Sequence, residues 1–331
     1  MTDVALYPLR FDPIFHYRLW GGRRLQEWLD TKLPGDGPIG EAWLLSDRHD
    51  FPSRVADGPL KGQTIAQLIK RSPGLVLGEL SGRHRQFPLL LKLLDVQKML
   101  SVQVHPPDDH IDFIPTGETG KTEAWVVLEA LPGARVYAGL KAGATAADLS
   151  ALSAQTADDY LPSFTPVSGQ GIFIKAGTVH SLGGGLVVFE VQQNSDVTYR
   201  LYDWNHIDPR TGHERALQTE QALACIDYEQ GAITPVIPLP EIVQPVVREQ
   251  LFNCPQFRLW RLQGTKPFRV GMEGLPHVLV CIDGAGNIEF NGVNFGMTRG
   301  TVVLLPAVVG ACTFTPVQQV ILLEIAIPYR I

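Results

Sequence analysis

The chain has 331 residues and 45% hydrophobic residues, which fit a soluble globular protein large enough for two domains. Its formal net charge is −6 at pH 7 and it has no basic run, so nucleic-acid binding is not expected, because a protein that follows a phosphate backbone needs a basic stripe. No apolar run is long enough to span a bilayer, which argues against a membrane protein.

The cysteine pattern and the N-terminus indicate the compartment. The four cysteines, at positions 225, 254, 281 and 312, are widely spaced and form no CxxC pair. This spacing fits a reducing environment and predicts no cysteine metal site. No basic region followed by an apolar stretch opens the chain, so no signal peptide is predicted. We therefore expect a cytoplasmic protein, while the sequence does not define its oligomeric state.

The first hundred residues mix short helices with strands. An extended, proline-marked segment over 7–20 leads into a predicted short helix at 24–29, and a strand follows at 43–46. Residues 63–70 have helical spacing and end before Pro73. We expect this helix, near 62–72, to be an insertion that packs outside a sheet.

The stretch LSVQVHP, from Leu100 to Pro106, alternates apolar and polar residues as a half-buried strand does. Residues two apart in a strand share a face, so Ser101, Gln103 and His105 point the same way. Polar side chains on an inner face are costly to bury without partners. A metal ion would supply that partner.

Two further segments carry the same kind of side chain. A predicted strand over 121–128 places Lys121 and Glu123 on one face, and a glycine-bracketed turn presents His180. A single histidine would more often be a hydrogen-bonded core residue. Two histidines, a carboxylate and the Gln103 oxygen together form an N/O metal shell with one position left open.

The rest of the chain returns to strands. A second helical insertion is predicted near 145–161, with Thr145 as its N-cap. A strand over 186–192 places Glu190 on one face, and the next strand carries Arg200. After a short helix at 218–225 and a proline-spaced linker at 235–245, glycine-punctuated strands are predicted. They lie near residues 257–262, 277–282, 287–290, 301–305 and 320–326.

Four of these segments together resemble one known family. LSVQVHP, GKTEAW, AGTVHSLGGG and FEVQQNSDVTYRLYD, in this order, are similar to type I mannose-6-phosphate isomerases in their short bacterial form. The resemblance implies a mainly β fold of two cupin-type jelly-roll domains with short helical insertions. Residues 1–235 would form the metal-binding catalytic domain, and residues 236–331 a metal-free cupin-like β domain.

The resemblance also implies roles for individual residues. The reaction would interconvert mannose 6-phosphate and fructose 6-phosphate through a cis-enediolate, with a sugar phosphate as the small-molecule partner. One Zn²⁺ per chain would be bound by Gln103, His105, Glu123 and His180, and Ser101, Lys121 and His206 would contact substrate. Arg200 would stabilise the enediolate, with an ion pair to Asp196 or Asp203 as its alternative role. Glu190 matches a glutamate proposed as base, and its alternative is a hydrogen-bonded buried carboxyl. Glu41 is expected either in the pocket or solvated after a turn.

One departure bears on the substrate. Relatives carry Lys or Arg six residues after the active-site arginine, whereas this chain has His206. Histidine is mostly neutral at pH 7, so phosphate binding would rest on Lys121, Ser101 and His206, with Lys175 or Arg210 as further cations. An isomerase of unphosphorylated mannose is the alternative.

Two readings from other functional classes also remain. Two histidines and a carboxylate can hold Fe(II) in a cupin dioxygenase, although Gln103 as a fourth ligand argues against this because oxygen and substrate need open positions. A sugar-binding cupin without catalysis is the other reading, and the intact Glu190, Lys121 and Arg200 argue against it.

Overall fold

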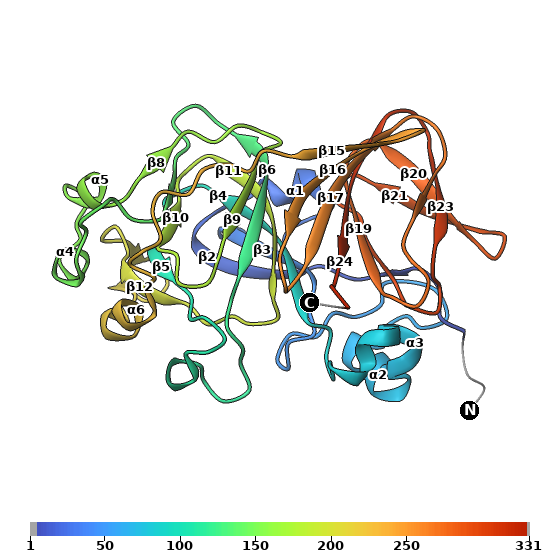
Figure 1. Cartoon of the computed structure of the whole chain (residues 1–331), viewed down its shortest axis with the longest axis horizontal. Coiled ribbons are helices and arrows are strands. Elements are labelled where there is room, and N and C mark those ends of the chain that lie inside the picture. Colours follow the sequence, from blue (N-terminus) through green and yellow to red (C-terminus); the bar gives the residue numbers. More distant parts are fainter. Residues whose placement is uncertain (1–4, 330–331) are drawn as a thin grey trace.

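Four larger antiparallel sheets, stacked in pairs, and one two-stranded sheet make up the described part of the chain (Figure 1). A computed structural model describes residues 5–329. Strands account for 40% of the residues and helices for 12%, so the prediction of a mainly β fold is confirmed. No helix in this described part of the chain is long and apolar enough to cross a membrane.

The first pair of sheets is built from the N-terminal two thirds of the chain. The six-stranded sheet has the order β2 (Ile14–Gly22), β3 (Ile39–Leu45), β4 (Leu89–Val96), β11 (Leu186–Gln193), β6 (Glu123–Ala130) and β9 (Gly171–Ile174). The five-stranded sheet has the order β12 (Tyr199–Tyr202), β5 (Val102–Val104), β10 (His180–Leu182), β7 (Val136–Ala138) and β8 (Ser163–Phe164). A hairpin of β13 (Ile207–Asp208) and β14 (His213–Glu214) follows β12.

The second pair is built mostly from the C-terminal third. The seven-stranded sheet has the order β1 (Leu9–Arg10), β22 (Val302–Leu305), β19 (His277–Asp283), β24 (Val320–Ala326), β17 (Arg258–Gly264), β16 (Val246–Asn253) and β15 (Leu239–Val243). The four-stranded sheet has the order β18 (Phe268–Val270), β23 (Cys312–Pro316), β20 (Ala285–Phe290) and β21 (Val293–Thr298).

The helices are short and lie outside the sheets (Figure 1). They are α1 (Leu25–Trp28), α2 (Ile65–Arg71), α3 (Pro73–Leu77), η1 (Gly78–Gly82), η2 (Ile111–Phe113), α4 (Ala146–Ser150), α5 (Ala157–Tyr160) and α6 (Thr219–Cys225). Thr64 and Thr145 each form a capping box, which explains where α2 and α4 begin. The helical insertions predicted near 62–72 and 145–161 are present as α2 with α3 and as α4 with α5.

The six-stranded sheet is buried on both faces. In β4, Leu91 and Leu93 belong to a core that also includes Val280 and Leu323 of the seven-stranded sheet. Leu94, on the opposite face of β4, packs in a separate core with residues of the five-stranded sheet. This double burial explains why β4 reads as an almost continuous apolar run.

Three local features differ from the sequence-based expectations. Glu41 lies within β3 rather than before it, and Lys121 precedes β6. The segment 235–245, predicted as a linker, contains β15, whose Pro240 is tolerated because the strand lies at a sheet edge. In addition, β1 pairs with β22, so the N-terminus contributes to the C-terminal sheet. The division at residue 235 remains a proposal.

Candidate active site

Three buried side chains converge between the six-stranded and five-stranded sheets. His105 follows β5, Glu123 begins β6 and His180 begins β10, and one donor atom from each lies within 4.8 Å of the others. His105 Nε2 is 3.4 Å from Glu123 Oε2, and His180 Nε2 is 3.4 Å from Glu123 Oε1. All three are at most 1% exposed, so solvent does not separate their charges.

The hydrogen bonds around these side chains leave room for a cation. His105 Nδ1 lies 2.8 Å from the carbonyl of Val197, and His180 Nδ1 lies 2.9 Å from the carbonyl of Thr178. Because a carbonyl only accepts, each Nδ1 donates and each Nε2 presents a lone pair to the carboxylate. Within residues 5–329 neither Glu123 oxygen accepts a hydrogen bond of good geometry. Lone pairs facing a buried carboxylate fit a bound divalent metal ion.

The protonation states agree with this arrangement. Burial, together with the charge of Lys121, lowers the pKa of His105 to about 3, so this imidazole is neutral at pH 7. Burial also lowers the pKa of His180. Burial alone would raise the pKa of Glu123, but Lys121 and the adjacent histidines hold it well below its usual range. Neutral imidazoles and an ionised carboxylate are the forms that bind metals.

Gln103 lies beside this group. It pairs with His180 across β5 and β10, and its Nε2 is 3.1 Å from His180 Nε2. Ser101 Oγ donates to Gln103 Oε1 at 3.2 Å. The two ends of an amide are nearly the same in shape, so a 180° rotation would turn the oxygen toward the histidine. Gln103 is therefore within reach of the same centre.

A lysine shares the buried group. Lys121 Nζ lies 2.9 Å from Glu123 Oε2 and 3.2 Å from His105 Nε2. Its side chain is only 4% exposed, and it also lines the adjoining cavity. A cation held there offers N–H donors to a ligand oxygen in the cavity.

A second buried lysine pairs with Glu190. Lys92 Nζ lies 3.2 Å from Glu190 Oε1 and 3.8 Å from an oxygen of Asp196, and Trp125 Nε1 donates to Glu190 Oε2 at 2.8 Å. Burial, reinforced by the charge of Glu123, raises the pKa of Glu190. Burial opposes the charge on Lys92, yet Glu190 and the other nearby carboxylates hold its pKa above the usual value.

Glu41 lies in the cavity wall as part of an ion pair. Arg18 donates to both of its oxygens, at 2.8 and 3.1 Å, and Trp43 Nε1 donates to Oε2 at 2.8 Å. Although burial alone would raise the pKa of Glu41, Arg18 and Lys92 lower it, so this carboxylate stays ionised. A tightly paired carboxylate of this kind is a poor general base.

Arg200 has no carboxylate partner within residues 5–329. Asp203 instead pairs with Arg215, and Asp196 lies nearest Lys92. The Nε of Arg200 is buried without a hydrogen-bond partner in the same range. Burial, followed by the repulsion of Arg215, lowers the pKa of Arg200. Neither of the ion pairs considered from the sequence forms.

A cavity of about 420 Å³, a size that suits a small ligand, adjoins the buried His105–Glu123–His180 group. His105, Glu123 and His180 are not part of its lining, but their neighbours Gln103 and Lys121 are. Its lining includes Arg18, Glu41, Lys92, Ser101, Gln103, Lys121, Trp125, Glu190, Asp196, Arg200 and Arg215. Three residues considered for phosphate binding are not in this lining, and one of them, Arg210, lies over the ring of Tyr17. His206 faces Asp203, with Nδ1 3.9 Å from Oδ1, and Lys175 is 61% exposed beside Asp227.

Sequence reasoning missed three cationic members of this cavity, namely Arg18, Lys92 and Arg215. Lys92 carried a usable signal, because it is the only cation in the apolar strand LLLKLLDV and a buried lysine needs a partner. Nothing in the sequence distinguishes Arg18 and Arg215 from exposed arginines. Their ion pairs with Glu41 and Asp203 become visible only in the structure.

The fold and the site define a β-sandwich protein with a candidate metal centre beside a cavity that suits a small ligand. Residues 9–117 match the family described as phosphomannose isomerase type I, catalytic domain. A probable mannose-6-phosphate isomerase of Bacillus subtilis is 31% identical over 309 residues, which are 93% of this chain and 96% of that protein. A mannose-6-phosphate isomerase of Streptococcus mutans is 30% identical over 93% of this chain and 95% of its own length.

A solved structure agrees with the sequence relatives. The crystal structure of the mannose 6-phosphate isomerase from Bacillus subtilis superposes with a TM-score of 0.87 at 25% identity, covering 96% of this chain and 99% of that one. This chain belongs to the type I phosphomannose isomerase family.

Proposed function

We propose that this chain is a zinc-dependent isomerase that interconverts mannose 6-phosphate and fructose 6-phosphate through a cis-enediolate. The observation that carries the proposal is the buried His105–Glu123–His180 group, which contacts Lys121 and Gln103 in the lining of the cavity. The Bacillus subtilis relative is named a probable mannose-6-phosphate isomerase and the Streptococcus mutans relative a mannose-6-phosphate isomerase, which supports the choice of substrate.

His105, Glu123, His180 and Gln103 would hold the metal ion. A bound zinc ion supplies a Lewis acid that polarises a substrate oxygen and is redox-inert, which suits a reaction without net electron change. The residues around it hold the sugar. Lys121 and Ser101 line the cavity next to the candidate metal ligands and offer hydrogen-bond donors to substrate oxygens.

The proton transfer is assigned to Glu190. Isomerisation removes a proton from C2 of the aldose and returns a proton to C1 of the enediolate, while the hydroxyl proton of O2 is transferred to O1. Glu190 lines the cavity, and its raised pKa makes the carboxylate a better base than an exposed glutamate. Lys92 and Trp125 fix the orientation of this carboxylate. Arg200, which forms no ion pair with a carboxylate in the described part of the chain, stabilises the negative charge of the enediolate.

The test is a coupled isomerase assay with mannose 6-phosphate and with free mannose, run with and without added zinc. Turnover of the phosphorylated sugar that depends on zinc supports the proposal. Equal turnover of free mannose would instead identify a hexose isomerase, and the absence of turnover with retained sugar binding would identify a binding protein.

A further inference from the structure

Arg215 reaches the cavity from the segment that follows β14. Its Nε donates to Asp203 Oδ2 at 2.7 Å, and its Nη2 donates to Asp203 Oδ1 at 2.5 Å. A guanidinium has five N–H donors, and this bidentate pair uses two of them. The other three make no hydrogen bond within residues 5–329, and the side chain lines the cavity. Arg215 is thus fixed in position with free donors.

Two arginines of the cavity lining, Arg200 and Arg215, have N–H donors that make no hydrogen bond within residues 5–329. Of the other lining cations, Arg18 is paired with Glu41, Lys92 with Glu190, and Lys121 with Glu123. That leaves Arg200, which lacks a carboxylate partner in the described chain, and Arg215, whose one partner is Asp203. The two guanidiniums are near enough for Arg215 to lower the pKa of Arg200. Asp196 and Asp208 also line the cavity, but Asp196 lies 3.8 Å from Lys92 and Asp208 accepts a hydrogen bond from Tyr17, and neither forms an ion pair with Arg200 or Arg215 within residues 5–329. The unused N–H donors of the two arginines can therefore bind an anion.

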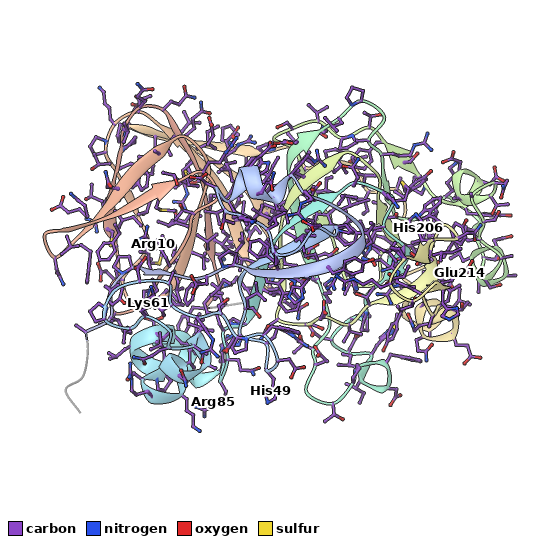
Figure 2. All side chains as sticks on the ribbon, turned by 180° about the vertical axis from the view of Figure 1, so that it is seen from behind. Arg10, His49, Lys61, Arg85, His206 and Glu214 are labelled. Atoms are coloured by element: carbon purple, nitrogen blue, oxygen red, sulfur yellow. The ribbon has the colours of Figure 1, made fainter. Side chains whose placement is uncertain are left out.

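His206 is poorly placed for that anion. Its imidazole is beside Asp203 and outside the cavity lining, and burial lowers its pKa, so it is neutral at pH 7. Asp203 therefore interacts with both His206 and Arg215, but only Arg215 lines the cavity. Figure 2 shows His206 and Glu214, the residue before Arg215, on the side of the molecule opposite Lys61.

We propose that Arg215, positioned by Asp203, binds the phosphate group of the substrate in place of His206. This inference rests on the proposed function, because it assigns the phosphate of a sugar phosphate to one residue of the same cavity. The planar fork of a guanidinium matches two phosphate oxygens, and a fork that is already held by a carboxylate loses little freedom on binding. Arg215 thereby selects phosphorylated over free sugars, and Asp203 is a positioning residue.

The experiment measures binding without turnover. A hexitol 6-phosphate has no carbonyl group and cannot isomerise, and the free hexitol is its matched ligand without phosphate. Calorimetric titration of metal-loaded protein with both ligands gives the contribution of the phosphate as a ratio of dissociation constants. The ratio is compared in wild type, Arg215→Gln, Arg215→Lys and Asp203→Asn. Lys61→Gln removes the same charge from an exposed residue and serves as the control.

The expected result is specific to the phosphate. Arg215→Gln should weaken binding of the hexitol phosphate roughly 10- to 100-fold, because hydrogen bonds to charged groups are strong, and should leave binding of the free hexitol within about twofold. Arg215→Lys should retain part of the affinity, since a point charge lacks the fork. Asp203→Asn should weaken only the phosphorylated ligand, and Lys61→Gln should match wild type.

Several outcomes would overturn the assignment. In the first, the ratio of the two dissociation constants is the same in wild type and Arg215→Gln. In the second, Arg215→Gln weakens binding of both ligands equally. In the third, wild type does not prefer the phosphorylated ligand. If Arg215→Gln does not fold, an unchanged ratio in Arg215→Lys overturns it equally. Because turnover is not needed, a wild type that binds the hexitol phosphate through Arg215 but does not isomerise mannose 6-phosphate would contradict only the proposed function.

Discussion

At the scale of single residues, the site depends on which ring nitrogen of each histidine is free to bind a metal ion. Backbone carbonyls engage Nδ1 of His105 and of His180, so both Nε2 lone pairs point toward Glu123. The same carbonyls fix the rotation of each ring, which is how ligand geometry is held before a metal binds. Removal of one ring therefore removes both a ligand and part of the geometry.

His105→Ala should lose bound metal and activity together. A metal site that loses one of its few protein ligands loses affinity and geometry, and we expect metal content to fall at least about tenfold. Elemental analysis of the purified protein beside the isomerase assay measures both. His49→Ala is the control, since His49 is exposed on the surface and pairs only with Asp50. Full metal content in His105→Ala would exclude the proposed ligand set.

Glu190→Gln should lower kcat by roughly 10²- to 10⁴-fold while metal content stays unchanged, because the amide cannot accept the proton. The pH profile of the wild type tests the same role. Glu190 must be ionised to act as base, so activity falls as pH falls through its pKa, which burial raises above the usual value of a glutamate. A variant with near-normal kcat would assign the base to another residue.

Arg200→Ala should lower kcat by roughly 10²- to 10³-fold and raise KM much less. The reason is that its charge is proposed to act on the enediolate, whose negative charge is absent from the bound sugar. Steady-state kinetics with mannose 6-phosphate separate the two parameters. A large increase in KM with unchanged kcat would instead make Arg200 a residue that binds substrate and product alike.

At the scale of secondary structure elements, β4 shows how the six-stranded sheet supports the site. Lys92 lies opposite Glu190 in the register of β4 and β11, and opposite Trp43 in the register of β3 and β4. The buried pair is compensated only while both partners are present, because either charge alone would be stranded in an apolar interior.

Lys92→Met should destabilise the fold by about 3–5 kcal/mol at neutral pH, since it leaves Glu190 buried without its cation. With the cation gone, the pKa of Glu190 rises further in the folded protein, while the unfolded value stays near 4.5. The folded state then binds more protons than the unfolded state. Stability is therefore retained below about pH 4.5 and lost as pH rises toward the pKa of Glu190 in the folded protein. Denaturant unfolding at several pH values measures this slope.

A double variant provides the control for this prediction. Lys92→Met combined with Glu190→Gln should recover much of the lost stability and remove the added pH dependence, because no buried charge remains without a partner. If Lys92→Met were as stable as wild type at pH 7, the pair would not be energetically coupled.

The elements also show what sequence reasoning can reach. Alternation along single strands was enough to place Gln103 and His105 on one face, because side-chain direction in a strand is a local property. The ion pair between Arg215 and Asp203 could not be predicted from the sequence, because Asp203 has other charged residues near it in the chain. The pairing of β1 with β22 was equally hidden, because it joins residues that are nearly the whole chain apart.

At the scale of the whole molecule, the two sheet pairs share a core. Phe189 of the six-stranded sheet and Ile325 of the seven-stranded sheet belong to the same cluster of buried residues, and β1 adds a strand from the N-terminus to the second pair. The six-stranded sheet that carries Glu123 and Glu190 is thus covered on its outer face by the C-terminal third. The proposed division at residue 235 therefore separates sequence segments that stabilise each other.

A fragment of residues 1–235 should fold poorly for this reason. Its six-stranded sheet would expose an apolar face to water, and burial of such a face is the main stabilising contribution. Circular dichroism melting and hydrogen exchange of the fragment, beside the full chain, measure the effect. A fragment with a cooperative transition and the metal affinity of the full chain would show that the two segments are independent.

We propose that one metal ion, held by His105, Glu123, His180 and Gln103, enables isomerisation of mannose 6-phosphate. The most direct measurement strips the full-length protein with a chelator, adds back zinc in steps and follows the isomerase rate with the bound metal. We expect no turnover in the stripped protein and an isomerase rate that rises linearly with bound zinc up to one zinc ion per chain. Full turnover in the metal-free protein would contradict it.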